Sequence, residues 1–201
     1  MWQMDDAHRF YSHMRPIEVR AEFDRREWDF DDYFKFTFVR NPWARLVSLY
    51  SMVFGRRNGL RSRVKRRTAE FFGHHPSPRG FRRWVRTVAT DGRGGGGPDD
   101  QRWQRYGTYA LGAYVGDGRG NELVDRVVRL EDIDTALPRV LAEIGLPPDS
   151  AAEIPIVNAG GRTNYRRYYD PATVDYVGSL YRDDIERFGY AFEGEGTAST
   201  A

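Results

Sequence analysis

Residues 34–50 read FKFTFVRNPWARLVSLY, and this stretch decides the fold. Phenylalanine occupies every second position at its start and Val39 follows, so residues 31–40 are predicted to form a strand that is largely buried in a sheet. Asn41 and Pro42 follow at once, as an N-cap and a first helical residue. The stretch therefore predicts a strand, a tight turn and a helix. Apolar residues continue this helix at intervals of three and four: Leu46, Val47, Tyr50, Val53 and Phe54.

Residues 123–145 repeat this pattern further along the chain. They predict a strand through Leu130 and then a helix that stops at Gly145. Because Pro138 lies inside the helical pattern, the helix either begins there or is kinked. One more helix is predicted from an Asp-Pro pair at 170–171 to a glycine at 189. Strand–helix units joined by short turns are typical of an α/β fold with a parallel sheet.

A single domain fits the length of 201 residues, and we expect it to span residues 1–192. The glycine-rich stretch 91–100 is predicted to be a flexible connector, and 193–201 a disordered tail. No run of apolar residues is long enough to cross a membrane, and the start of the chain is polar, which predicts a soluble cytoplasmic protein. The absence of cysteine excludes disulfides, thiolate metal sites and a cysteine nucleophile.

Basic residues gather in the middle of the chain. The net charge is +2 overall but +12 over residues 36–93, and 29 of the 31 basic residues are arginines, which suit bidentate binding of phosphate, sulfate or carboxylate. Seven basic residues without an acid stand in RRNGLRSRVKRR, 56–67. This run could be a solvated loop, a landing surface for an acidic substrate or a nucleic-acid patch. Regularly interleaved aromatic residues are absent from it, which disfavours nucleic acid.

The junction between the first strand and its helix is a candidate anion site. Arg40 stands at the carboxyl end of the strand, where ligands of open α/β sheets bind and where a helix N-terminus presents free amides. Arg45 and Ser48 are three residues apart, on neighbouring positions of one helix face. Together these groups suit a phosphate monoester. An equally open interpretation is that the arginines pair with acids at the end of the second strand, Glu131 or Asp132.

Three segments together resemble the sulfotransferases that use 3′-phosphoadenosine-5′-phosphosulfate (PAPS), in particular the family-2, carbohydrate-type group. These are residues 34–50, with the Arg-Asn-Pro turn and a serine eight residues after the arginine; VDRVVRLEDID, 124–134; and NAGGRTNYRRYYDPATVDYVGSLYRDDIERFGYAF, 158–192. The resemblance implies a three-layer sandwich with a parallel sheet, like that of P-loop nucleoside triphosphatases (NTPases). It also implies PAPS as co-substrate, no metal, and a hydroxyl or amine acceptor.

The resemblance assigns roles to individual residues. Arg40 and Ser48 match the pair that holds the 3′-phosphate of the donor. Arg45, on the same helix face as Ser48, is expected to bind the donor with them. Arg162 and Tyr165 fall in the segment that closes over the nucleotide in similar enzymes. His13 is similar in order to the histidine that serves as base in some members, but it could equally be an ordinary surface or core histidine.

The sequence departs from this family at its beginning. Members start with a strand and a loop that contains a lysine and consecutive Ser/Thr residues and cradles the 5′-phosphosulfate, and no such pattern precedes Phe34. Lys35 is predicted to alternate outward between two phenylalanines, and Lys65 lies in the arginine run. We therefore expect a fold truncated at its N-terminus, either because the protein starts further upstream or because it is a truncated relative.

Three functions follow from these observations. The first is a sulfotransferase with a hydroxyl-bearing acceptor, for which we expect a carbohydrate or another small molecule. The second is a non-catalytic relative that binds only the 3′-phosphonucleotide. The third is a basic nucleic-acid-binding module built on 56–67, although no nucleic-acid partner is expected.

Overall fold

The computed structural model describes residues 10, 13–55, 76–95, 105–153 and 164–192. The chain divides into two units by its internal contacts. The strand unit comprises Met1–Arg40 and Leu111–Ala159, and the helical unit comprises Asn41–Ala110 and Gly160–Ala201. The expectation of one domain over 1–192 stays a prediction.

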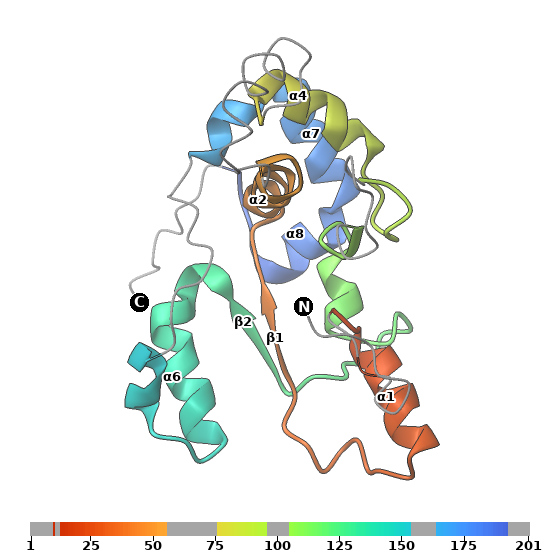
Figure 1. Cartoon of the computed structure of the whole chain (residues 1–201), viewed down its shortest axis with the longest axis vertical. Coiled ribbons are helices and arrows are strands. Elements are labelled where there is room, and N and C mark those ends of the chain that lie inside the picture. The colour runs from red at the N-terminus through yellow and green to blue at the C-terminus, as the bar shows by residue number, and fades with distance from the viewer. Residues whose placement is uncertain (1–9, 11–12, 56–75, 96–104, 154–163, 193–201) are drawn as a thin grey trace, which may run out of the picture. The chain divides into compact units, whose positions relative to one another are not determined.

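A parallel pair of strands organises the strand unit. β1 (Phe36–Val39) runs beside β2 (Arg126–Arg129), with Phe36 opposite Arg126 and Val39 opposite Arg129 (Figure 1). A 3₁₀ turn, η3 (Leu130–Asp132), leads from β2 into helix α6 (Ile133–Glu143), which packs against β2. The prediction of a mixed α/β fold with a parallel sheet is confirmed. Three further elements complete the described part of this unit: α1 (Pro16–Arg25), η2 (Leu111–Tyr114) and η4 (Pro148–Glu153).

Helix α6 runs through the proline inside it. It begins at Ile133, five residues before Pro138, so the alternative that the helix begins at the proline is wrong. Pro138 cannot donate a hydrogen bond to the preceding turn. Two buried residues immediately after it, Val140 and Leu141, anchor the helix and offset that loss.

The aromatic face of β1 is more exposed than its pattern predicts. Phe36 is 38% and Phe38 is 41% exposed, whereas Val39 on the other face is fully buried. The prediction of a largely buried strand is therefore wrong for the described structure. Alternation shows that two faces differ, but which one is covered depends on what packs there.

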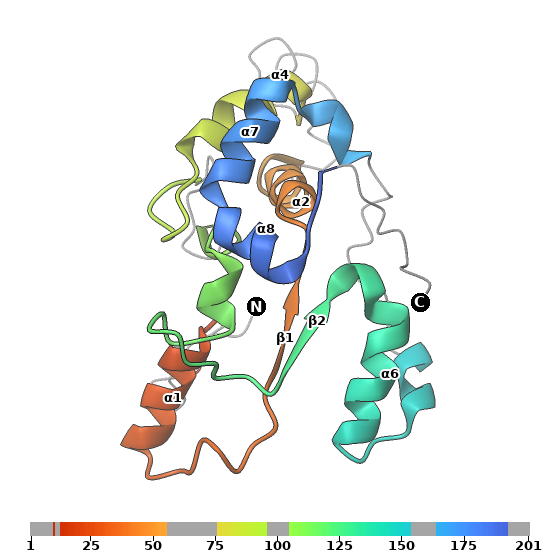
Figure 2. The ribbon, with the colours of Figure 1, turned by 180° about the vertical axis from the view of Figure 1, so that it is seen from behind.

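Aromatic side chains form the core of the helical unit. Its described α-helices are α2 (Pro42–Gly55), α4 (Pro78–Trp84), α7 (Pro171–Leu180) and α8 (Arg182–Phe188), seen from behind in Figure 2. The ring of Phe81 meets Tyr50 on α2 at 5.6 Å between centroids and Tyr169 at 4.9 Å, both edge to face. Tyr168 of the 3₁₀ turn η5 (Tyr165–Tyr168) lies 5.7 Å from the same ring. Phe81 is fully buried and holds three elements together.

The long helix predicted from 171 to 189 is two helices. α7 ends and α8 begins around Tyr181, whose φ of −117° and ψ of 29° are not helical. The Tyr181 side chain is buried, and its hydroxyl donates to the carbonyl of Thr108 at 2.6 Å. Both predicted ends are confirmed, because the Asp170 side chain caps α7 through Thr173 N–H and Gly189 adopts the left-handed conformation.

The predicted connector at 91–100 is described only as far as Gly95. In this part the glycines make close contacts, since a Cβ on Gly94 would clash with the carbonyl oxygen of Thr87. The carbonyl of Gly95 accepts a hydrogen bond from the indole of Trp84 at 3.1 Å. Residues 96–100 and the predicted tail lie outside the described residues. Within the residues that are described, no helix combines the length and the apolar character needed to span a bilayer.

Candidate functional site

Asn41 caps the first turn of α2. Its Oδ1 accepts hydrogen bonds from the N–H groups of Trp43 at 3.1 Å and Ala44 at 3.3 Å, and its carbonyl accepts from Arg45 N–H at 2.8 Å. Its Nδ2 donates to the carbonyl of Ala191 at 2.9 Å. Asn41 is buried. Its hydrogen bond to Ala191 joins the start of α2 to residues 191–192, the last described residues of the helical unit.

This cap changes how an anion could bind beside α2. Pro42 has no N–H, and the next three N–H groups already donate to Asn41. The expectation that the helix presents free amides is wrong, because the cap competes with any ligand for them. Binding of an anion at this junction must therefore rest on side chains.

Arg40 lies in the strand unit and Ser48 in the helical unit, so the surroundings of each residue are described within its own unit. Arg40 directly follows β1 and is half-buried, and Ser48 lies exposed on α2. Their role as a pair that holds a phosphate stays a prediction. Asp132, one of the acids considered as an arginine partner, lies 3.5 Å from the Nε of Arg129.

Arg45 points into the helical unit. Its Nη2 donates to the carbonyl of Tyr109 at 2.8 Å, and its guanidinium lies over the ring of Tyr181, 5.0 Å from the centroid. Burial raises the pKa of Tyr181 to about 12, so its phenol stays protonated at neutral pH. Arg45 thus links α2 to the break between α7 and α8, while Ser48 one turn later faces solvent. The predicted contact of Arg45 with a donor nucleotide stays a prediction.

Tyr165 contacts the segment of chain that follows α8. Its hydroxyl donates to the carbonyl of Phe192 at 2.5 Å, and the two rings meet edge to face at 5.6 Å between centroids. This contact ties η5 to the chain after α8, and a role in binding a nucleotide stays a prediction. Arg162, predicted beside it, and the basic run 56–67 lie outside the described residues.

His13 precedes α1 in the strand unit. Its φ of +67° lies in the left-handed region, which is uncommon for a residue with a side chain. The side chain is exposed at the surface, yet the protein around it desolvates the imidazole enough to lower its pKa below the ordinary value of 6.5. At pH 7 the ring is neutral and can accept a proton. Its role as a catalytic base stays a prediction.

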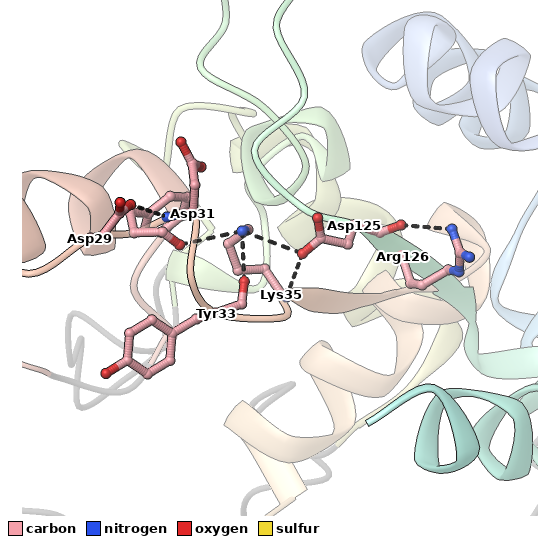
Figure 3. A network of polar contacts seen from close by, with 7 residues as sticks. Asp29, Asp31, Tyr33, Lys35, Asp125 and Arg126 are labelled. Atoms are coloured by element: carbon pink, nitrogen blue, oxygen red, sulfur yellow. Dashed lines mark hydrogen bonds and ion pairs between the residues drawn. The ribbon is translucent and has the colours of Figure 1, made fainter. Parts of the chain in front are cut away.

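A lysine–aspartate clamp at the amino ends of the two strands was missed by the sequence analysis. The backbone N–H of Lys35 donates to Oδ2 of Asp125 at 2.7 Å, and its Nζ lies 3.4 Å from the same oxygen (Figure 3). The ammonium also donates to the carbonyls of Tyr33 at 2.7 Å and Phe30 at 3.3 Å. Lys35 therefore folds back against the chain, and the prediction that it points outward is wrong.

The sequence did hold a signal for this clamp. Lys35 and Asp125 each come directly before a strand, and the strands pair with Phe36 opposite Arg126. Residues at equivalent ends of adjacent parallel strands lie side by side, so opposite charges in these two positions predict a contact.

Acid is expected to weaken the clamp between Lys35 and Asp125. The backbone N–H of Lys35 and, to a smaller extent, its ammonium lower the pKa of Asp125 below the ordinary value of 3.8. A carboxyl group whose pKa is lower in the folded state stabilises the fold above its unfolded pKa and ceases to do so as the pH falls through the lowered value. The melting temperature of Asp125→Asn should thus fall less than that of the wild type between about pH 5 and pH 2.

The control for this measurement is Asp134→Asn, on the exposed surface of α6. It should keep the wild-type dependence on pH. A dependence in Asp125→Asn as steep as that of the wild type would show that the clamp contributes nothing to stability.

A match to a known family agrees with this arrangement of a strand, an Arg-Asn-Pro turn and a capped helix. The chain matches the model of the sulfotransferase family over residues 3–191 and belongs to that family. Searches of curated proteins and of solved structures gave no match. The described residues contain no group of three or more His, Cys, Asp or Glu side chains that could hold a metal ion.

Proposed function

We propose that this protein transfers a sulfuryl group from PAPS to a hydroxyl or amine group of an acceptor. The observation that supports the proposal most is the family match over residues 3–191, which includes the junction between β1 and α2. Sulfuryl transfer follows from membership of the family in general terms. The donor, the acceptor and the roles of individual residues are our proposals.

The donor's 3′-phosphate is proposed to bind Arg40 and Ser48. A guanidinium and a hydroxyl are both hydrogen-bond donors, and a phosphate monoester offers only acceptors at neutral pH, so the two side chains fit this ligand chemically. The first amides of α2 are occupied by Asn41, which leaves these side chains as the proposed contacts. Asn41 then has a positioning role, because it holds the start of the helix that carries Ser48.

Catalysis is proposed to rest on positioning, cationic stabilisation and a base. PAPS supplies the activated sulfuryl group; its sulfur–oxygen bond to the phosphate breaks as the acceptor oxygen bonds to sulfur, and adenosine 3′,5′-bisphosphate leaves. The acceptor's proton goes to His13, whose lowered pKa keeps it neutral and ready at pH 7. A general base of this kind contributes about 10²–10⁴-fold to the rate.

Turnover of labelled PAPS with a panel of neutral sugars, acidic glycans and small alcohols and amines tests this proposal. Transfer of label to at least one acceptor is expected, with carbohydrates foremost. His13→Gln should lower kcat by about 10²–10⁴-fold, and the matched substitution Arg139→Gln on exposed α6 should not. Binding of adenosine 3′,5′-bisphosphate without transfer to any acceptor would instead indicate a non-catalytic relative.

The contribution of Ser48 is measured by its alanine variant. Loss of one hydrogen bond to a charged group costs about 1.5–3 kcal/mol, or about 10–100-fold in affinity for adenosine 3′,5′-bisphosphate. Ser179→Ala removes an equally exposed hydroxyl from α7 and should bind the nucleotide as the wild type does. Equal affinities in Ser48→Ala and Ser179→Ala would remove Ser48 from the proposed site.

A further inference from the structure

A pocket of about 300 Å³ lies at the amino end of β1 in the strand unit. Small-molecule sites in proteins begin at about this size and are lined mostly by apolar and aromatic side chains with a few polar groups. The lining of this pocket has that composition. Its apolar and aromatic members include Met14, Val19, Phe30, Phe34, Tyr114 and Val124.

The pocket is separate from the proposed phosphate position. Lys35 lines it and stands directly before β1, whereas Arg40 directly follows the strand. Thr37 is the lining residue nearest to Arg40 along the strand, and three residues of extended chain span about 10 Å. The pocket therefore lies toward the opposite end of β1 from Arg40.

The charge in the pocket is already balanced. Among the described residues of the lining, Lys35 is the one with a charge, and an ammonium has three donors. Those donors face the carbonyls of Phe30 at 3.3 Å and Tyr33 at 2.7 Å and the carboxylate of Asp125 at 3.4 Å, as Figure 3 shows around Tyr33 and Asp125. The ammonium also lies 4.9 Å from the centroid of the Phe30 ring. The ammonium of Lys35 therefore offers an anionic ligand neither a free donor nor an unbalanced positive charge.

We infer that this pocket binds the aromatic ring of an uncharged ligand. The rings of Phe30, Phe34 and Tyr114 offer stacking and edge contacts, and burial of the ligand's apolar surface supplies the main driving force. A charged ligand would lose hydration that the lining does not replace. The inference goes beyond the proposed function, because it concerns binding alone and requires no sulfuryl transfer.

Equilibrium dialysis of the full chain with two matched probes tests the inference. 2-Naphthol is an uncharged aromatic ring system, and 2-naphthoate carries a carboxylate on the same rings. Saturable binding of 2-naphthol at one site is expected, with affinity for 2-naphthoate lower by about tenfold or more. Absence of saturable 2-naphthol binding, or equal affinity for the two probes, would overturn the inference.

Substitutions that fill the pocket test whether 2-naphthol binds there. Val19→Phe on α1 and, as a second variant, Val124→Phe before β2 place a ring in the cavity and should each weaken 2-naphthol binding by about tenfold or more. Val127→Phe adds the same ring to an exposed position of β2 that does not line the pocket and should bind as the wild type does. Melting curves identify which variants fold, and wild-type binding in a folded pocket-filling variant contradicts the inference.

Asp125→Asn tests the charge balance. It keeps an oxygen that can accept from Lys35 N–H but removes the negative charge, so the ammonium is left uncompensated and affinity for 2-naphthoate should rise by about tenfold. If Asp125→Asn kept the wild-type preference for 2-naphthol over 2-naphthoate, this would contradict the inference that Asp125 balances the charge of Lys35. Arg40→Ala should bind 2-naphthol normally, so failure of the pocket and failure of the proposed donor site are separate results.

Discussion

Arg40→Ala is expected to abolish the thermal stabilisation that adenosine 3′,5′-bisphosphate gives the wild-type chain. A ligand at one hundred times its dissociation constant stabilises the folded state by roughly 2.7 kcal/mol. For a chain of this length that free energy corresponds to a rise in melting temperature of about 5–10 °C. Arg40 is proposed to form two hydrogen bonds with the 3′-phosphate, and each is worth about 1.5–3 kcal/mol when a charged group is involved.

The residual shift in the variant follows from these values. A hundredfold weaker affinity at the same ligand concentration leaves only about 0.4 kcal/mol of stabilisation, or roughly 1 °C. Differential scanning fluorimetry with and without the nucleotide measures it. Arg139→Ala, which removes an exposed arginine from α6, serves as the control and should keep the full shift. Equal shifts in the wild type and Arg40→Ala would refute the proposed donor site.

Asn41→Ala is expected to destabilise the protein by more than the loss of an ordinary helix cap. Losing a cap costs about 1 kcal/mol, and buried groups left without partners cost about 1–3 kcal/mol more, so we expect about 2–4 kcal/mol in all. The groups concerned are the N–H groups of Trp43 and Ala44 and the carbonyl of Ala191. Urea unfolding with a common m value measures the difference.

Asp170→Ala is the matched control for this measurement. Asp170 also precedes a helical proline and caps through its side chain, but the carboxylate is exposed. Besides the cap it accepts from the hydroxyl of the buried Thr173 and pairs with Arg82, so the cost should be about 1–2 kcal/mol. Asn41→Ser keeps an uncharged side-chain acceptor for α2 and loses the donation to Ala191, which should give an intermediate value. A cost in Asn41→Ala no larger than that in Asp170→Ala would show that the buried contacts add nothing.

The elements predicted with the right type all had strong local signals. Asn41 and Pro42 begin a helix, and Asp170 with Pro171 does the same, because a side-chain cap and a proline act on the turn they occupy. Gly189 ends its helix in the left-handed conformation for the same kind of reason. Local chemistry of this kind is independent of how distant segments pack.

Three of the predictions that were wrong concern contacts between distant residues. The break in the last helix at Tyr181 coincides with a hydrogen bond to Thr108, and no local residue marks it. Lys35 folds back because Asp125, ninety positions later, accepts from it. The exposure of Phe36 and Phe38 likewise depends on what packs on that face of the sheet.

The amino-acid sequence alone determined three features of this protein: two strands that are each followed by a helix, a parallel sheet, and an Arg-Asn-Pro turn between a strand and a helix. These features follow from alternation, capping and chain connectivity within a few residues. Only the tertiary structure decided that Asn41 also donates to the carbonyl of Ala191, that Arg45 turns toward Tyr109 and Tyr181, and that the charge of Lys35 is compensated by Asp125. The physical reason is that a polar group binds whichever partner folding brings within hydrogen-bond distance, and that partner is set by the packing of the whole chain.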